Sequence, residues 1–175
     1  MAFFKAKTIQ GVVYDLDHLR PFRFSLAVGG SERVVGVRFG LHCFTEQVKP
    51  HHTPDLHYIH GDERRAFSLE RHALSKLLPG LIATLGSKTV YLSNSANYFI
   101  LRDNPMPAFE GPYLVFFRTM KARNTEADVI MRVESSYIKR NMADRASPVK
   151  FATLIEKTAL GQHVPRGPQQ SIKRK

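Results

Sequence analysis

Hydrophobic and polar side chains alternate along several stretches of the chain, with the period of two that is typical of strands with one buried face. This pattern predicts three strands near the N-terminus, at residues 8–15, 20–28 and 33–44. We expect the first two to pair, and a glycine-rich turn to precede the third. Four further strand-like stretches come later, at residues 89–92, 98–101, 113–120 and 127–138.

A helical pattern separates the two groups of strands. Ser68 has the position of a helix N-cap, and apolar residues then recur at the spacing of an amphipathic helix. Pro79 must end or kink that helix, so we expect one long helix over about residues 67–85 with a bend at Pro79. Ser147 and Pro148 are predicted to start a short C-terminal helix, which Gly161 ends.

Strands, a helix, more strands and a short helix, in that order, indicate an α+β fold with a mainly antiparallel sheet. The length of 175 residues suits one domain. We expect this domain to span residues 1–162 and a basic, disordered tail to follow at residues 163–175. Residues 45–65 are predicted to form a long loop, and compact domains usually keep such loops for a function.

The charge balance is the clearest feature of the composition. The chain has 26 Lys and Arg against 15 Asp and Glu, a net charge of +11. Residues 139–175, with nine basic and two acidic side chains, hold +7 of it, and residues 1–138 hold the other +4. An excess of this size attracts polyanions, and phosphate backbones are the most common of these. We therefore expect RNA or DNA as the partner, although charge also serves solubility alone.

Cysteine content and hydropathy bear on the compartment. Cys43 is the only cysteine, so no internal disulfide can form, which fits a reducing compartment. No apolar run approaches the roughly 20 residues that a membrane-spanning helix needs, and the N-terminus is charged too early for a secretory signal. We expect a cytoplasmic bacterial protein without a membrane partner, in which Cys43 is a buried structural thiol.

Histidines are concentrated in the predicted loop, at positions 51, 52, 57 and 60. Imidazoles at such short spacing are potential ligands of a transition metal, and His51, His57 and His60 are the residues for that alternative. Their spacing matches no established metal motif, and incidental histidines in a polar loop explain the cluster more simply. We therefore assign no metal and no cofactor.

Four residues are candidates for catalysis. His42 shares a strand face with Arg38 and two glycines, which suits a general acid or base beside a shallow surface. Arg71, near the start of the long helix, is the candidate to stabilise a charged phosphorane. Ser135 and Tyr137 continue one face of the last long strand to its end, where they can position a phosphate. A strand-end serine and an ordinary sheet aromatic are the alternative interpretation.

Cations interleaved with aromatic residues form a second set of candidates. Such mixtures suit single-stranded nucleic acid, in which bases stack on rings and phosphates pair with cations. Any strand with one wet face shows the same alternation, and Arg64 and Arg65 can instead pair with neighbouring acidic side chains. The predicted nucleic-acid-binding residues are Arg38, Arg64, Arg65, Arg118, Lys121 and Arg123.

A family resemblance rests on several short segments between residues 35 and 154. They are His42-Cys43-Phe44-Thr45, Glu63-Arg64-Arg65 with Phe67, Arg71 with Ser75 and Leu78-Pro79, Asn97-Tyr98-Phe99, Tyr113 to Phe117, and Val133 to Tyr137. Together they resemble a pattern in a family of small uncharacterised bacterial proteins. More distantly, a helix followed by antiparallel strands that end in Ser-x-Tyr is similar to metal-independent ribonucleases of the barnase, colicin and RelE-like toxin class. That resemblance implies cleavage of RNA through its own 2′-hydroxyl.

Three hypotheses of function stay open at this point. The first is an RNA-directed protein whose catalytic form is a metal-independent ribonuclease of toxin type, with His42 as general base or acid. Such a toxin would also have an acidic protein partner. The second is a non-catalytic nucleic-acid-binding accessory protein of a mobile element or stress module. The third is a metal-dependent hydrolase that uses the histidine-rich loop.

Overall fold

The computed structural model describes residues 3–93, 97–101, 106, 108–123, 126–139, 145–164 and 170–171. The strands are β1 (Lys7–Ile9), β2 (Val12–Tyr14), β3 (Phe22–Val28), β4 (Ser31–His42), β5 (Thr45–Glu46), β6 (His57–His60), β7 (Glu63–Phe67), β8 (Thr89–Leu92), β9 (Asn97–Leu101), β10 (Tyr113–Lys121), β11 (Val129–Ile138), β12 (Arg145–Lys150) and β13 (Gln170–Ser171). The α-helices are α1 (Leu69–Ser75), α2 (Leu78–Ala83) and α3 (Phe151–Ala159), and the 3₁₀ turns are η1 (Asp17–Leu19), η2 (Pro54–Leu56) and η3 (Leu85–Ser87).

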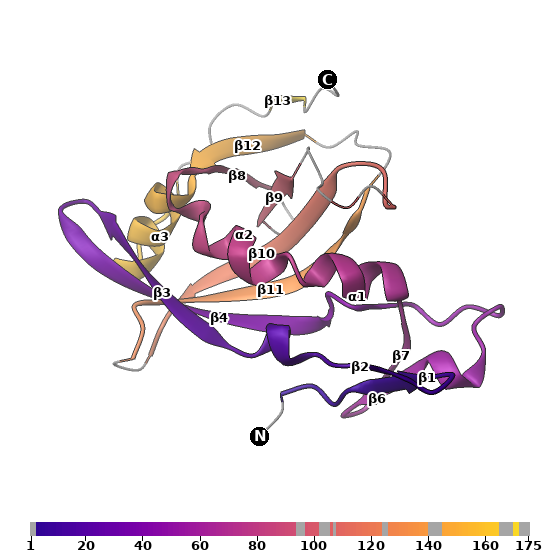
Figure 1. Cartoon of the computed structure of the whole chain (residues 1–175). Coiled ribbons are helices and arrows are strands. Elements are labelled where there is room, and N and C mark those ends of the chain that lie inside the picture. The colour runs from indigo at the N-terminus through magenta and orange to yellow at the C-terminus, as the bar shows by residue number, and fades with distance from the viewer. Residues whose placement is uncertain are drawn as a thin grey trace.

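Eight of the described strands form the main sheet, in the order β13-β12-β8-β9-β10-β11-β4-β3. Neighbouring strands are antiparallel except β4 and β11, which run parallel. The predicted α+β class with a mainly antiparallel sheet is therefore confirmed. The bent helix is also confirmed, because α1 and α2 are separate helices and Pro79 lies in the first turn of α2. The short C-terminal helix is α3 (Figure 1).

One face of the main sheet packs against the helices and encloses the core. In β4, Val35, Val37 and Phe39 are buried and belong to the same apolar cluster as Leu78 and Ile82 of α2. Phe151 of α3 packs on Phe24 and Phe117, with ring centres 6.4 and 6.1 Å away. Strand alternation turns the intervening residues to the opposite face, where Arg38, Arg118 and Arg132 are exposed. We call this second face the uncovered face where β3, β4 and β11 and the Arg118 end of β10 expose it; nearer β12, Leu114 and Ala146 are buried in a separate small apolar cluster.

The predicted loop at residues 45–65 is wrong, because these residues contain a small sheet of order β5-β7-β6. In β6 only Tyr58 is buried, so the apolar alternation by which such a strand is recognised is almost absent. Its contacts are tertiary: the Tyr58 hydroxyl donates to the carbonyl of Lys5 at 2.9 Å, and the Tyr58 ring packs on Phe44, 5.0 Å between centres. The small sheet lies beside the β1-β2 hairpin (Figure 1).

The expected pairing of residues 8–15 with residues 20–28 is also wrong. Residues 8–15 hold most of a hairpin of their own, in which β1 pairs with β2. Gln10 and Gly11 have φ of 49° and 81°, as a tight two-residue hairpin turn requires. Strand β3 pairs instead with β4 through Gly29 and Gly30, which both have positive φ. The predicted turn there is confirmed.

The predicted start of the C-terminal helix is wrong as well. Ser147 and Pro148 lie in β12, where Pro148 is paired with Tyr91 of β8. Strand β13 pairs with β12 only at Arg145 and Ala146, so Pro148, which has no N–H to donate, lies beyond that pairing. Lys150 is the N-cap of α3.

Of the predicted disordered tail at 163–175, residues 165–169 and 172–175 lie outside the described residues, and Gln170–Ser171 form β13. Cys43 is completely buried, as predicted. No helix in the described part of the chain has the length and hydrophobicity to cross a membrane.

A pair of histidines links the N-terminal segment to α1. His18 Nε2 lies 2.7 Å from Ser75 Oγ, His72 Nε2 lies 2.8 Å from the carbonyl oxygen of Asp15, and the two rings are 5.5 Å apart. Burial lowers the pKa of His18 to about 4, and it also lowers the pKa of His72 below its usual value. Both imidazoles are therefore neutral in the folded protein at neutral pH.

We expect acid to destabilise the protein through these histidines. The pKa of His18 is about 6.5 in the unfolded chain and about 4 in the folded protein. Between these two pH values the unfolded chain therefore binds a proton that the folded protein does not bind. The free energy of unfolding should therefore fall as pH drops through this window, by on the order of 1–2 kcal/mol given the partial exposure of His18. Urea denaturation at pH 7, 5.5 and 4.5 measures it. His18→Gln should weaken the pH dependence, and an unchanged slope would contradict this assignment.

Candidate active site

The end of β4 places His42 in a hollow on the uncovered face. His42 Nε2 lies 2.7 Å from Oε1 of Glu63, the first residue of β7, and the two side chains are 42% and 45% exposed. The hydrogen bond from His42 holds the pKa of Glu63 below its usual value, so this carboxylate is ionised at neutral pH. A carboxylate at Nε2 favours the tautomer with the proton on that nitrogen. Nδ1 is then the basic nitrogen, and no described residue hydrogen-bonds it.

A glycine and a β-bulge shape this hollow. It encloses about 300 Å³ and is lined by Gly40, Leu41, His42, Glu63, Arg132 and Glu134. The pairing of β11 with β4 shifts between Val133 and Ser135, which sets Ser135 opposite His42. A Cβ atom on Gly40 would lie 3.0 Å from the carbonyl oxygen of Glu134. Only glycine lets β4 approach the bulge so closely, so Gly40 determines where His42 and Ser135 meet.

Arg71 of α1 is hydrogen-bonded to the backbone at the end of β4. Its Nη1 donates to the carbonyl oxygens of His42 and Thr45, at 3.1 and 2.8 Å. Its guanidinium carbon lies 4.9 Å from the centre of the Tyr137 ring. Ser68 is the predicted N-cap of α1, and its hydroxyl accepts a hydrogen bond from the Arg71 N–H at 3.3 Å. Burial lowers the pKa of Arg71 from its usual value, but a guanidinium stays charged at neutral pH.

The two predicted residues on β11 lie next to this cluster. They do not continue the face of Val129, Met131 and Val133 as predicted, because the β-bulge after Val133 turns Ser136 into the core instead. Ser135 is the partner of His42 in the β4-β11 pairing. Tyr137 stacks on Phe116 of β10, with ring centres 5.2 Å apart and an interplanar angle of 24°. The structure thus brings His42, Arg71, Ser135 and Tyr137 to one place, the adjoining ends of β4 and β11. Their catalytic roles stay predictions.

Three arginines form a line across the uncovered face. Arg38 of β4 pairs with Arg132 of β11, and Arg132 pairs with Arg118 of β10. We call these three exposed residues the arginine row. Neighbouring strands are about 4.8 Å apart, so the row places three positive charges within about 10 Å. Arg118 is 3.2 Å from Glu134, whereas no ion pair joins Arg38 or Arg132 to another residue in the described ranges.

The arginine row is unfavourable for the isolated protein. Like charges directly opposite one another destabilise a sheet, by roughly 0.2–1 kcal/mol for each pair. An anion that spans neighbouring strands would remove this repulsion, and a chain of phosphates is such an anion. Arg132 belongs both to the row and to the lining of the hollow at His42. The middle of the arginine row is therefore in the same hollow as His42.

The remaining predicted nucleic-acid-binding residues lie in different places. Arg65 is at the hollow, because its Nε donates to Thr45 Oγ1 at 2.9 Å and its Nη1 lies 3.5 Å from Glu63 Oε1. Arg64 points elsewhere, with its Nη2 2.8 Å from Nδ1 of His57. Lys121 and Arg123 are exposed at the turn between β10 and β11, which is the end of those strands far from Tyr137.

The histidines at 51–60 make other contacts. The rings of His51 and His52 are 4.4 Å apart, and the ring of His60 lies 5.2 Å from that of Phe4. His57 is hydrogen-bonded to Arg64. The pKa of His57 is below its usual value, mainly because of burial. Among the described residues, no three His, Cys, Asp or Glu side chains are grouped so that they could hold a metal ion.

Two residues of this site were not predicted, the partner of His42 and the central arginine. Glu63 begins a strand inside the supposed loop, so nothing in its neighbourhood pointed to His42. Arg132 lies between the buried Met131 and Val133, and this alternation was sufficient to place it on a solvent-exposed face. Its alignment with Arg38 depends on a parallel pairing between strands about 90 residues apart, which no local pattern indicates.

The chain is similar to one known protein family over most of its length. A model of the YjaZ family matches residues 6–159 of the chain. The chain belongs to the YjaZ family. The matched range holds the strands from β1 to β12, the helices α1, α2 and α3, and each residue of the site. No curated protein and no solved structure matches this YjaZ-family chain. The predicted resemblance to a bacterial protein family is confirmed, and the resemblance to ribonucleases stays a prediction.

Proposed function

We propose that this protein binds single-stranded RNA on the uncovered face of its main sheet and cleaves it without a metal. The observation that carries the proposal is the junction of the arginine row with the His42–Glu63 pair at Arg132. A backbone held by the row passes the hollow in which an imidazole and a carboxylate lie within hydrogen-bonding distance. An acidic protein partner of antitoxin type would be attracted to the same arginines.

RNA carries its own nucleophile, so this reaction needs a base, a stabilised phosphorane and a proton for the leaving group. Nδ1 of His42 accepts the proton of the 2′-hydroxyl, and the Nε2 proton stays shared with the ionised Glu63. O2′ attacks the adjacent phosphorus, the bond from phosphorus to O5′ breaks, and O5′ takes a proton from water. The products are a 2′,3′-cyclic phosphate and a free 5′-hydroxyl. DNA has no 2′-hydroxyl and cannot react in this way.

The other residues of the site have supporting roles in this proposal. Arg132 and Arg65 flank the hollow and stabilise the extra negative charge of the phosphorane. Arg71 contributes its charge at longer range and acts as a positioning residue, because its Nη1 holds the carbonyl of His42. Ser135 lies beside His42 and can donate to a phosphate oxygen.

Cleavage in the presence of EDTA is the direct test. Protein purified without a histidine tag is incubated with a 20-nucleotide single-stranded RNA and, separately, with DNA of the same sequence. We expect the RNA to be cut, the DNA to remain whole, and the new 3′ ends to carry cyclic phosphate. Intact RNA at high protein concentration would overturn the proposal. Cleavage that requires an added metal would favour a hydrolase that uses the histidines at 51–60.

A non-catalytic nucleic-acid-binding protein is the second candidate, and the arginine row favours it independently of His42. Three aligned cations can bind a phosphate backbone whether or not the protein cleaves it. This alternative predicts salt-sensitive binding of RNA and DNA without turnover. A gel-shift assay on the same two oligonucleotides distinguishes it from the first proposal.

A further inference from the structure

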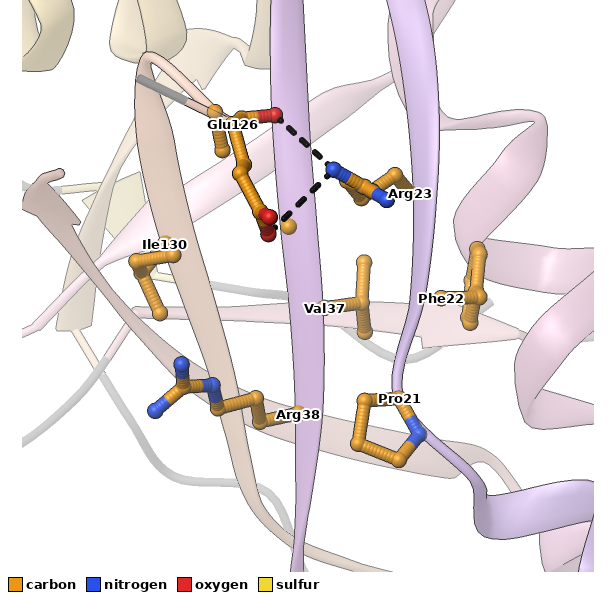
Figure 2. Close-up of a pocket in the computed structure, with 9 residues that line it drawn as sticks. Pro21, Phe22, Arg23, Val37, Arg38, Glu126 and Ile130 are labelled. Carbon is orange, nitrogen blue, oxygen red and sulfur yellow. Dashed lines mark hydrogen bonds and ion pairs between the residues drawn. The ribbon is translucent and has the colours of Figure 1, made fainter. Parts of the chain in front are cut away.

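A second hollow lies on the uncovered face, beside Gly36 and Arg38 in the middle of β4. It encloses about 240 Å³ between β3 and β11, and its walls include Pro21, Arg23, Gly36, Arg38, Glu126 and Ile130 (Figure 2). We call it the Gly36 hollow. It shares Arg38 with the arginine row and shares no residue with the hollow at His42.

Glycine at position 36 keeps this space open. The backbone of Gly36 does not have positive φ, so the strand geometry itself would accept another residue. A Cβ atom there would lie 3.2 Å from Ile130 Cδ1 and 3.5 Å from Ala127 Cβ. Glycine within a strand weakens it by roughly 0.5–1 kcal/mol relative to alanine, and it often marks a place where a ligand approaches the backbone. On its buried face, the same strand has large side chains at Val35, Val37 and Phe39.

The lining of the Gly36 hollow suits a nucleotide. Arg23 of β3 reaches across β4 to Glu126, and its Nη1 lies 3.4 Å from both the carboxylate and the carbonyl oxygen of Glu126 (Figure 2). This contact presents a donor and an acceptor side by side, which is what the edge of a nucleobase can pair with. Ile130 and Pro21 offer apolar surface to the face of a ring. Arg38 supplies a cation that no described residue pairs.

The position of the Gly36 hollow fits a strand that also reaches His42. Arg38 lies four residues before His42 on β4, which corresponds to about 13 Å along the strand. That separation exceeds the contacts of one nucleotide. A strand of several nucleotides, with one phosphate at His42, would therefore bring a further nucleotide over Arg38.

We propose that the Gly36 hollow is a nucleotide-binding subsite, in which a base lies against Ile130 and Pro21 and its phosphate pairs with Arg38. This inference rests on the proposed function, because it assumes that an RNA strand lies on the uncovered face. It makes the substrate a single strand of several nucleotides, since a base in a duplex would have to be unpaired and unstacked before it entered the hollow.

Binding of RNA that cannot be cut tests this subsite. The probe is a fluorescent 2′-O-methyl uridine hexanucleotide, which lacks the attacking hydroxyl. Gly36→Val fills the hollow and should weaken binding by about tenfold, as expected for loss of one stacked base. Ser25→Val is the matched control, because Ser25 is an exposed residue of β3 outside the hollow. It should leave the affinity unchanged.

A second variant guards against misfolding of the first. Ala127→Leu fills the same hollow from a residue that precedes β11, so it leaves the backbone of β4 unchanged. Equal affinity of wild type and a folded Gly36→Val or Ala127→Leu protein would overturn the subsite, as would a wild type that does not bind the probe. The result is independent of catalysis. A protein that cuts no RNA but loses affinity in both variants would retain the subsite and lose the proposed cleavage.

Discussion

Replacing His42 with alanine is expected to lower the rate of RNA cleavage by about 10²–10⁴-fold, the usual contribution of a general base. The imidazole is the only described group in the hollow with a basic nitrogen that lacks a hydrogen-bond partner. Its side chain is 42% exposed, so its removal leaves no cavity in the core and the fold should be retained. Single-turnover cleavage of an RNA oligonucleotide measures the effect, and thermal unfolding confirms the fold.

Two further variants separate this role from simpler explanations. His51→Ala removes an exposed histidine outside the hollow and should leave the rate unchanged. Glu63→Gln keeps the size of the side chain but removes the charge that stabilises a protonated His42, so it should lower the rate less than His42→Ala does. If His51→Ala impaired cleavage while His42→Ala did not, the catalytic centre would have to move to the histidines at 51–60.

Neutralising the arginine row should weaken RNA binding by on the order of 100-fold at low salt. The triple variant is Arg38→Gln, Arg118→Gln and Arg132→Gln. Three contacts with phosphates, at about 1 kcal/mol each, give this factor. The dependence of log K on log salt should also flatten by about 2, because single strands contribute roughly 0.7 for each phosphate contact. Fluorescence anisotropy with the 2′-O-methyl hexanucleotide between 50 and 200 mM salt provides both values.

A matched triple variant distinguishes the row from net charge. Lys76, Lys88 and Lys157 lie on or beside α1, η3 and α3, and changing them to glutamine removes the same total charge. If the arginine row is the binding surface, this control should lose much less affinity. An equal loss in both triples would mean that the overall charge of +11 attracts RNA without a defined site.

The distribution of charge matters because much of the excess lies near the C-terminus. Residues 139–175 hold +7 of the net charge, so an even scatter over the remaining chain would leave no reason to expect a nucleic-acid surface. The structure instead aligns three arginines on adjacent strands and leaves two of them without an ion pair among the described residues. Their alignment supports binding more strongly than the net charge does.

Local patterns were sufficient for several parts of the fold and of the candidate site. Alternation along β4 predicted that Arg38 and His42 share the face that the core does not use, and the structure agrees. The N-cap at Ser68, the bend before Pro79 and the burial of Cys43 followed from single residues and their neighbours. Each of these features depends on interactions within a few residues, which a sequence displays directly.

Local patterns failed wherever a strand is defined by its partner. Strand β6 shows little apolar alternation and is held through Tyr58, so the whole segment looked like a loop. Pro148 looked like a helix start but lies in β12, at a place where a missing N–H is tolerated. In both cases the deciding contacts come from residues distant in the chain.

By itself, the sequence determined the α+β class, the face on which His42 and Arg38 lie, and the excess of positive charge. Only the tertiary structure decided that β4 runs parallel to β11, that Glu63 meets His42, and that Arg132 joins Arg38 to Arg118. The physical reason is that alternation specifies which side of a strand a residue occupies, whereas register between distant strands comes from the packing of the whole core.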